Sequence, residues 1–165
     1  RTASASVERS RRGGEFRRVA LTPEDRRGGL LTQAGLLLGN STGSDSHIIK
    51  RAVFVRERLL HDPPSPPPPN VPELKTEGPE FAQLSTLQQL EIHQEDPACA
   101  DCHANIDPWG VALEELDALG NWREEIVRGE GKKAQRFPVI SHGTLPSGAE
   151  VRGLYGLTEY ILTER

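Results

Sequence analysis

The residues of this chain with the clearest chemical capacity lie in one pentapeptide, Cys99-Ala100-Asp101-Cys102-His103. Its C-x-x-C-H spacing is the pattern by which haem is attached covalently to a protein. Two residues separate the cysteines, so on a single helical turn both thiols can reach the vinyl groups at one edge of a porphyrin. His103 follows directly and can bind the iron as its proximal ligand. The motif therefore predicts one covalent haem c, held by Cys99, Cys102 and His103.

Two other sites can be built from the same residue types. A zinc site would combine the two thiols and the imidazole of the motif with His93, although the adjacent Cys102 and His103 would be strained on one tetrahedral ion. A redox-active Cys-x-x-Cys pair would need a strand before it and a long helix after it, which the pattern does not indicate. Both cysteines of the chain belong to the motif, so no other thiol competes for these roles. Covalent haem is our main interpretation, and a zinc-bearing interaction module is an alternative.

The sixth position of the iron has several candidate ligands. A thioether ligand is excluded because the chain contains no Met. His93, on the segment that leads into the motif, and His47, at the start of an expected helix, are the main candidates, beside a Lys or a vacant position. His61 and His142 are weaker candidates, since they fall at a helix end and in a turn. An occupied sixth position suits pure electron transfer, whereas an open one would suit a peroxidase-like or oxidase-like enzyme.

Four helices and a proline-rich strap are predicted to position the motif. Apolar spacing and capping signals predict the helices at about residues 45–62, 81–95, 107–119 and 154–163. In the first of them, Lys50, Arg51, Glu57 and Arg58 are assigned to the outer face. Asp107-Pro108 is interpreted as the N-cap and first-turn proline of the third helix, and Trp109 is expected to pack on the haem. The strap, residues 63–72, should be extended polyproline II.

Composition sets the expected fold class. Only 35% of the residues are hydrophobic and 5% aromatic, with 16 Gly and 13 Pro, which favours short helices joined by irregular segments. We expect a mainly α fold: a small cytochrome c-like helical haem domain with the proline-rich strap and a small α+β C-terminal appendage that contains a hairpin. The predicted divisions are an N-terminal arm or tail of a preceding domain at 1–27, the haem domain at 28–122 and a companion domain at 123–165.

Charge is distributed unevenly along the chain. Through Asp62 there are twelve Lys and Arg against seven Asp and Glu, and from Pro63 onward there are eight against seventeen. Oppositely charged halves could form a homo-oligomer or dock to a charged redox partner, although two solvated surfaces are the simpler interpretation. The basic residues carry no nucleic-acid-binding motif, and no segment is long and apolar enough to predict a membrane span.

Several segments resemble the planctomycete-type cytochrome c domain, which is found near the C-terminal end of large secreted bacterial proteins. They are RRGGLLTQAGLL, SDSHIIKRAVFVRERLL followed by PPSPPPPNVP, and HQEDPACADCHANIDPWGVALEELDALGNWR. ISHGTLPSGAEVRG resembles the companion domain that usually follows, and GEFRRVAL resembles the end of the domain that usually precedes it.

This resemblance implies a mono-haem domain of a larger parent chain, exported to the periplasm or the cell surface. It gives Cys99 and Cys102 the attachment role and His103 the proximal role. His93 matches a histidine that the family often has before the motif, and His47 matches one present in part of the family. The family has no well-established activity, so the resemblance supplies no substrate. We therefore expect an electron carrier rather than a catalyst.

Overall fold

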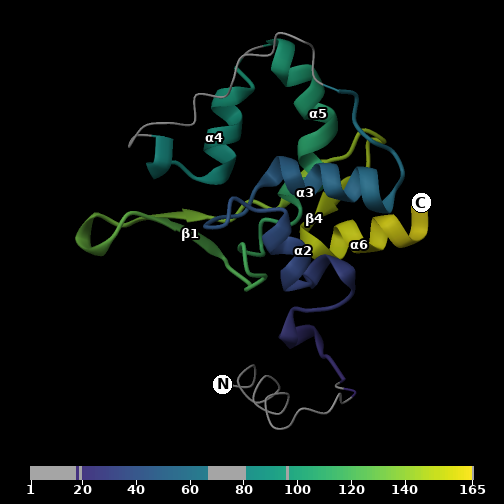
Figure 1. Cartoon of the computed structure of the whole chain (residues 1–165), viewed down its shortest axis with the longest axis horizontal. Coiled ribbons are helices and arrows are strands. Elements are labelled where there is room, and N and C mark those ends of the chain that lie inside the picture. Colours follow the sequence, from purple (N-terminus) through teal and green to yellow (C-terminus); the bar gives the residue numbers. More distant parts are fainter. Residues whose placement is uncertain (1–17, 19, 67–80, 96, 165) are drawn as a thin grey trace.

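The computed structural model describes residues 18, 20–66, 81–95 and 97–164 of the chain (Figure 1). Most of the strap, and all but the end of the predicted N-terminal arm, lie outside these residues. The helices within them are α2 (Ala34–Gly39), α3 (Ile48–Phe54), α4 (Thr86–His93), α5 (Pro97–Val111) and α6 (Gly153–Glu164). The strands are β1 (Glu125–Arg128), β2 (Gln135–Pro138), β3 (His142–Thr144) and β4 (Glu150–Arg152). Short helical turns, η1 to η5, occupy Pro23–Asp25, Leu30–Thr32, Val55–Leu59, Phe81–Gln83 and Gly131–Lys133.

The expected mainly α fold class is wrong, because the described chain is an α+β mixture. Two separate antiparallel hairpins form after residue 122, β1 with β2 and β3 with β4, where the sequence predicted one. Ile126 and Val151, which lie on these strands, are buried, so the hairpins contribute to the interior of the protein. Each strand has only three or four residues, and several are charged. Apolar alternation over so short a length is too weak to be recognised in a sequence.

The first predicted helix exists, but its start and its faces differ from the prediction. His47 caps α3, while Asp45 and Ser46, at the predicted start of this helix, bond instead to Arg123 and to Glu114. A π-helical turn, η3, continues α3 before the strap begins. The sequence could not reveal the different start, because these partners of Asp45 and Ser46 lie more than 60 residues further along the chain.

Arg51, which was assigned to the outer face of this helix, is fully buried. Its guanidinium donates hydrogen bonds to the carbonyl oxygens of Leu113, Leu116 and Asp117, at 2.9, 2.6 and 2.7 Å. These carbonyls follow the end of α5, and those of Leu113 and Asp117 also accept turn hydrogen bonds from the backbone N–H groups of Leu116 and Gly120. The carboxylate of Glu114 lies 3.8 Å from the same guanidinium. Arg51 therefore joins α3 to the segment that follows α5.

The helix that carries the motif begins ten residues earlier than the third predicted helix. Pro97 opens α5, and the helix continues through Pro108, so the prediction that Asp107-Pro108 starts a helix is wrong. A proline inside a helix removes one backbone hydrogen bond. Here Pro108 lies beside Gly143 of β3, and the Asp107 side chain does not cap the backbone but bonds to other side chains.

The larger of two hydrophobic clusters in the described residues joins the N-terminal and C-terminal parts of the chain. α6 confirms the predicted final helix to within one residue at each end. Its apolar face packs with residues of α2, α3, α5 and the second hairpin. The buried members are Leu31, Leu37, Ala52, Val55, Trp109, Ala112, Leu113, Leu116, Leu145, Val151, Leu154 and Leu157. The predicted domain boundary at 122/123 stays a prediction, but the core does not stop there.

Some opposite charges of the two halves meet within one chain. Arg26 lies 3.1 Å from Glu124 and also stacks on Trp122, with 4.5 Å from its guanidinium carbon to the ring centroid. Asp45 pairs in turn with Arg123, at 3.1 Å, and with Arg128. Of these contacts, only Arg26 with Glu124 pairs the excess positive charge of the first half with the excess negative charge of the second.

Candidate haem attachment site

The whole C-x-x-C-H motif lies on α5, whereas the third predicted helix began only at residue 107. At 3.6 residues per turn, Cys99, Cys102 and His103 fall within an arc of about 100° on one side of the helix. Both cysteines are free thiols; Cys99 is buried and Cys102 is exposed. Two thiols and an imidazole are thus presented on one helical face, in the order that a covalent haem requires.

The imidazole of His103 is held by a carboxylate one turn further along α5. Its Nδ1 lies 2.9 and 3.0 Å from the two carboxylate oxygens of Asp107. Gln94, the C-cap residue of α4, donates an amide hydrogen bond of 2.5 Å to the same carboxylate. Burial raises the pKa of Asp107, and the hydrogen bonds with His103 and Gln94 oppose that rise. With Nδ1 facing Asp107, the other ring nitrogen, Nε2, is the one suited to a metal.

Asp107 and Gln94 were not identified as site residues from the sequence. The signal for Asp107 was present, because His103 and Asp107 have the i, i+4 spacing that brings side chains together on a helix. The adjacent Pro108 made a cap the more obvious interpretation. Gln94 carries no comparable signal, since its contact with Asp107 depends on how α4 packs on α5.

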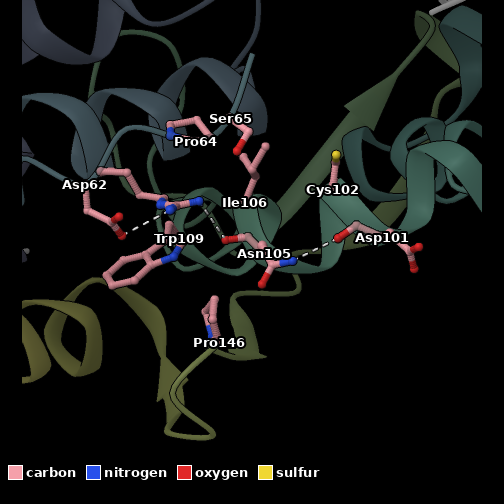
Figure 2. Close-up of a pocket in the computed structure, with 10 residues that line it drawn as sticks. Asp62, Pro64, Ser65, Asp101, Cys102, Asn105, Ile106, Trp109 and Pro146 are labelled. Carbon is pink, nitrogen blue, oxygen red and sulfur yellow. Dashed lines mark hydrogen bonds and ion pairs between the residues drawn. The ribbon is translucent and has the colours of Figure 1, made fainter. Parts of the chain in front are cut away.

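A cavity of about 310 Å³ adjoins the motif on the Cys102 side of α5 (Figure 2). Its walls come from α5, from η3, from the first residues of the strap and from the turn between β3 and β4. Among the lining residues are Arg56, Asp62, Pro64, Cys102, Trp109 and Pro146. A space of this kind beside an exposed thiol could take part of a bound prosthetic group.

Two donors in the cavity wall lack partners. Arg56 Nε–H and Trp109 Nε1–H are buried and donate no hydrogen bond to the described residues. Buried polar groups are rarely left unsatisfied in folded proteins, but Arg51 Nε and Trp122 Nε1, which do not line the cavity, also lack a partner among the described residues. A haem carries carboxylates that can accept such bonds. The residues around the motif fit haem c by their ligand types.

Trp109 is first of all a core residue. It is 1% exposed and packs edge-to-face on Tyr160 of α6, with ring centroids 5.9 Å apart. It also forms part of the cavity wall. Its predicted contact with a haem stays a prediction.

The side chains of three candidate distal ligands, His47, His61 and His142, are described. His47 caps α3, accepting a 3.5 Å hydrogen bond at Nδ1 from the backbone N–H of Lys50. Burial lowers the pKa of His47, and the nearby charges of Lys50 and Arg51 lower it further. His93 is the last residue of α4, and its side chain lies outside the described residues. His61 and His142 are exposed. The distal ligand stays a prediction.

The zinc alternative gains no support from the geometry. Within the described residues, no three His, Cys, Asp or Glu side chains gather closely enough to hold a metal ion. The segment just before the motif is helix α4, not the strand that a thioredoxin-like site would require.

Comparison with known proteins identifies the family of this chain. Residues 27–126 match a cytochrome-type domain found in planctomycetes. The chain belongs to the PSCyt3 family, which is described as a protein of unknown function (DUF1588). The match includes α2 to α5 and the motif, and it ends within β1. No curated protein and no solved structure matches the chain. In the part of the chain that the structure describes, none of the helices combines the length and apolarity needed to cross a membrane.

Proposed function

We propose that this chain is a mono-haem c-type cytochrome domain that carries single electrons. One observation carries the proposal: two free thiols and an imidazole lie on one face of α5, and the imidazole is oriented by a buried carboxylate. In metal sites, a histidine ligand commonly donates its second ring N–H to a carboxylate or a carbonyl. Membership of a cytochrome-type family supports the same conclusion.

Each residue of the motif has a defined part in this proposal. The thiols of Cys99 and Cys102 each add across a vinyl C=C bond, so that sulfur bonds to one carbon and a proton goes to the other. His103 presents Nε2 to the iron from the same helix. Haem, when bound, supplies an iron that alternates between the ferric and ferrous states.

Attachment can be tested with the protein made in a host that has haem c maturation machinery. The purified protein should be coloured, should gain the mass of one haem, and should keep its pigment in acid acetone. Replacing both cysteines (Cys99→Ala with Cys102→Ala) should abolish covalent pigment. The control Ala104→Ser changes an exposed position of α5 outside the motif and the cavity wall and should retain it. A colourless wild-type protein, or pigment that acid acetone extracts, would overturn the proposal.

The type of function is tested by coordination and redox behaviour. A reversible titration that fits a single one-electron step, with slow or no binding of carbon monoxide to the reduced protein, is expected of an electron carrier. Rapid binding of carbon monoxide or cyanide would support the alternative, a haem enzyme with an open sixth position. Spectra of His93→Ala and His47→Ala would show which of the two, if either, is the sixth ligand.

We propose further that the domain works outside the cytoplasm, in the periplasm or at the cell surface, as its resemblance to secreted proteins implies. Its electron partner would be a separate redox protein or another domain of a larger parent chain. Cell fractionation of the native host, followed by haem staining, tests this location. Pigmented protein confined to the cytoplasm would contradict it.

A further inference from the structure

Asp107 is the buried partner of the motif histidine, and its carboxylate is bound from two helices. Both of its oxygens lie within 3.0 Å of Nδ1 of His103, which is on the same helix. Gln94 approaches from the end of α4 and donates to Oδ2 at 2.5 Å. Asp107 is 4% exposed, so water does not compete strongly for these bonds. The carboxylate therefore has two protein donors and little access to solvent.

This arrangement determines the form of the histidine that is useful for ligation. A nitrogen that binds iron must present a lone pair, so Nε2 has to be unprotonated and the ring proton has to lie on Nδ1. A carboxylate next to Nδ1 favours that tautomer, because it accepts the Nδ1–H bond. The amide of Gln94 keeps the carboxylate in place, but its donated hydrogen bond also weakens the carboxylate as an acceptor for Nδ1–H. The two partners of Asp107 thus act on the same acceptor in different ways.

We propose that Asp107 is a positioning residue that lowers the reduction potential of the haem through His103, an inference that rests on the proposed function. A hydrogen bond from Nδ1–H to a carboxylate increases the electron density that the imidazole donates through Nε2. A stronger donor stabilises ferric iron more than ferrous iron, which lowers the potential. Gln94 weakens the carboxylate as an acceptor, so it raises the potential. Asp107 and Gln94 set the potential in opposite directions.

The direct test is the reduction potential of the pigmented protein with Asp107→Asn. The amide keeps the shape of the side chain but removes the charged acceptor. The equilibrium constant for reduction should rise about tenfold, which is 59 mV for a one-electron couple. Glu91→Gln is the control, because it removes one negative charge from an exposed position of α4, outside the motif and the cavity wall. Its shift should be clearly smaller. A shift of Asp107→Asn no larger than that of the control would overturn the proposal.

A second variant keeps the proposal testable if Asp107→Asn does not hold its haem. Gln94→Leu leaves the His103–Asp107 bond in place but removes the amide that weakens the Asp107 carboxylate as an acceptor. The equilibrium constant for reduction should then fall several-fold, and an unchanged or higher value would overturn the proposal. A colourless wild-type protein is a different result, because it would overturn the proposed function itself before any potential could be measured.

Discussion

Gly110, near the end of α5, gives the most direct test of how the helices pack. α3 crosses α5 at this residue. A Cβ atom at position 110 would lie 2.0 Å from the backbone oxygen of Ile48 and 2.8 Å from its carbonyl carbon. Ordinary van der Waals contacts begin at 3.4 Å, so Gly110→Ala requires the two helices to separate by about 1.4 Å at the crossing.

Two terms of opposite sign decide the size of the effect. Alanine is a better helix former than glycine by about 1 kcal/mol. Overpacking a buried contact costs about 1–3 kcal/mol, and here the cost should reach about 3 kcal/mol because the obstacle is backbone, which cannot rotate away. The net loss in free energy of unfolding should be about 2 kcal/mol. For a chain of this size, that loss lowers Tm by about 4–8 °C.

Urea unfolding followed by circular dichroism measures this loss. Gly35→Ala is the matched control, since Gly35 also lies in a helix but would place its Cβ in open space. That variant should be more stable than wild type by about 0.5–1 kcal/mol. The reasoning would be refuted if Gly110→Ala were as stable as wild type, because the close crossing of α3 and α5 could not then be as described.

Two further predictions concern buried charge. Arg51→Met should lower the free energy of unfolding by about 3 kcal/mol or more, because three carbonyls lose a charged donor. Arg58→Met, at an exposed side chain, should change it by less than about 0.5 kcal/mol. Equal effects of the two variants in urea unfolding would contradict this prediction. Burial raises the pKa of Asp45, but its ion pairs with Arg128 and Arg123 outweigh burial and leave the pKa below 3.8. The ionised carboxylate therefore stabilises the fold above that value, and this contribution is lost as the pH falls through the lower, folded-state pKa. Asp45→Asn should lose less stability than wild type between pH 7 and pH 3, and identical pH profiles would argue against this assignment.

The sequence identified the motif and the final helix, because both depend on local spacing. The five residues of the motif are contiguous, and the apolar residues of α6 repeat at helical intervals over three turns. These signals need no knowledge of distant contacts. In the same way, the two cysteines and His103 could be assigned to one face as soon as they were placed on a helix.

What the sequence did not reveal depends on contacts between distant segments. Asp107 beside Pro108 has the local pattern of a helix start, and only the contact with Gln94 and the continuous helix α5 show otherwise. Arg51 was placed on the solvent face because it is charged, yet it is buried against carbonyls more than 60 residues away. The strands were too short to show alternation. In each case tertiary packing overrode a correct local preference.

The shared core has a practical consequence for where the chain can be cut. A fragment that ended at residue 126, the limit of the family match, would stop inside β1 and would lack Leu145, Val151, Leu154 and Leu157. Each of these buried side chains contributes about 1.5–3 kcal/mol, and together they approach the whole stability of a typical domain, about 5–15 kcal/mol. In such a fragment the core side chains of α5 and of the segment after it, such as Trp109 and Leu113, would be exposed and prone to aggregation. Expression fragments meant to hold haem should therefore run to Glu164 at least.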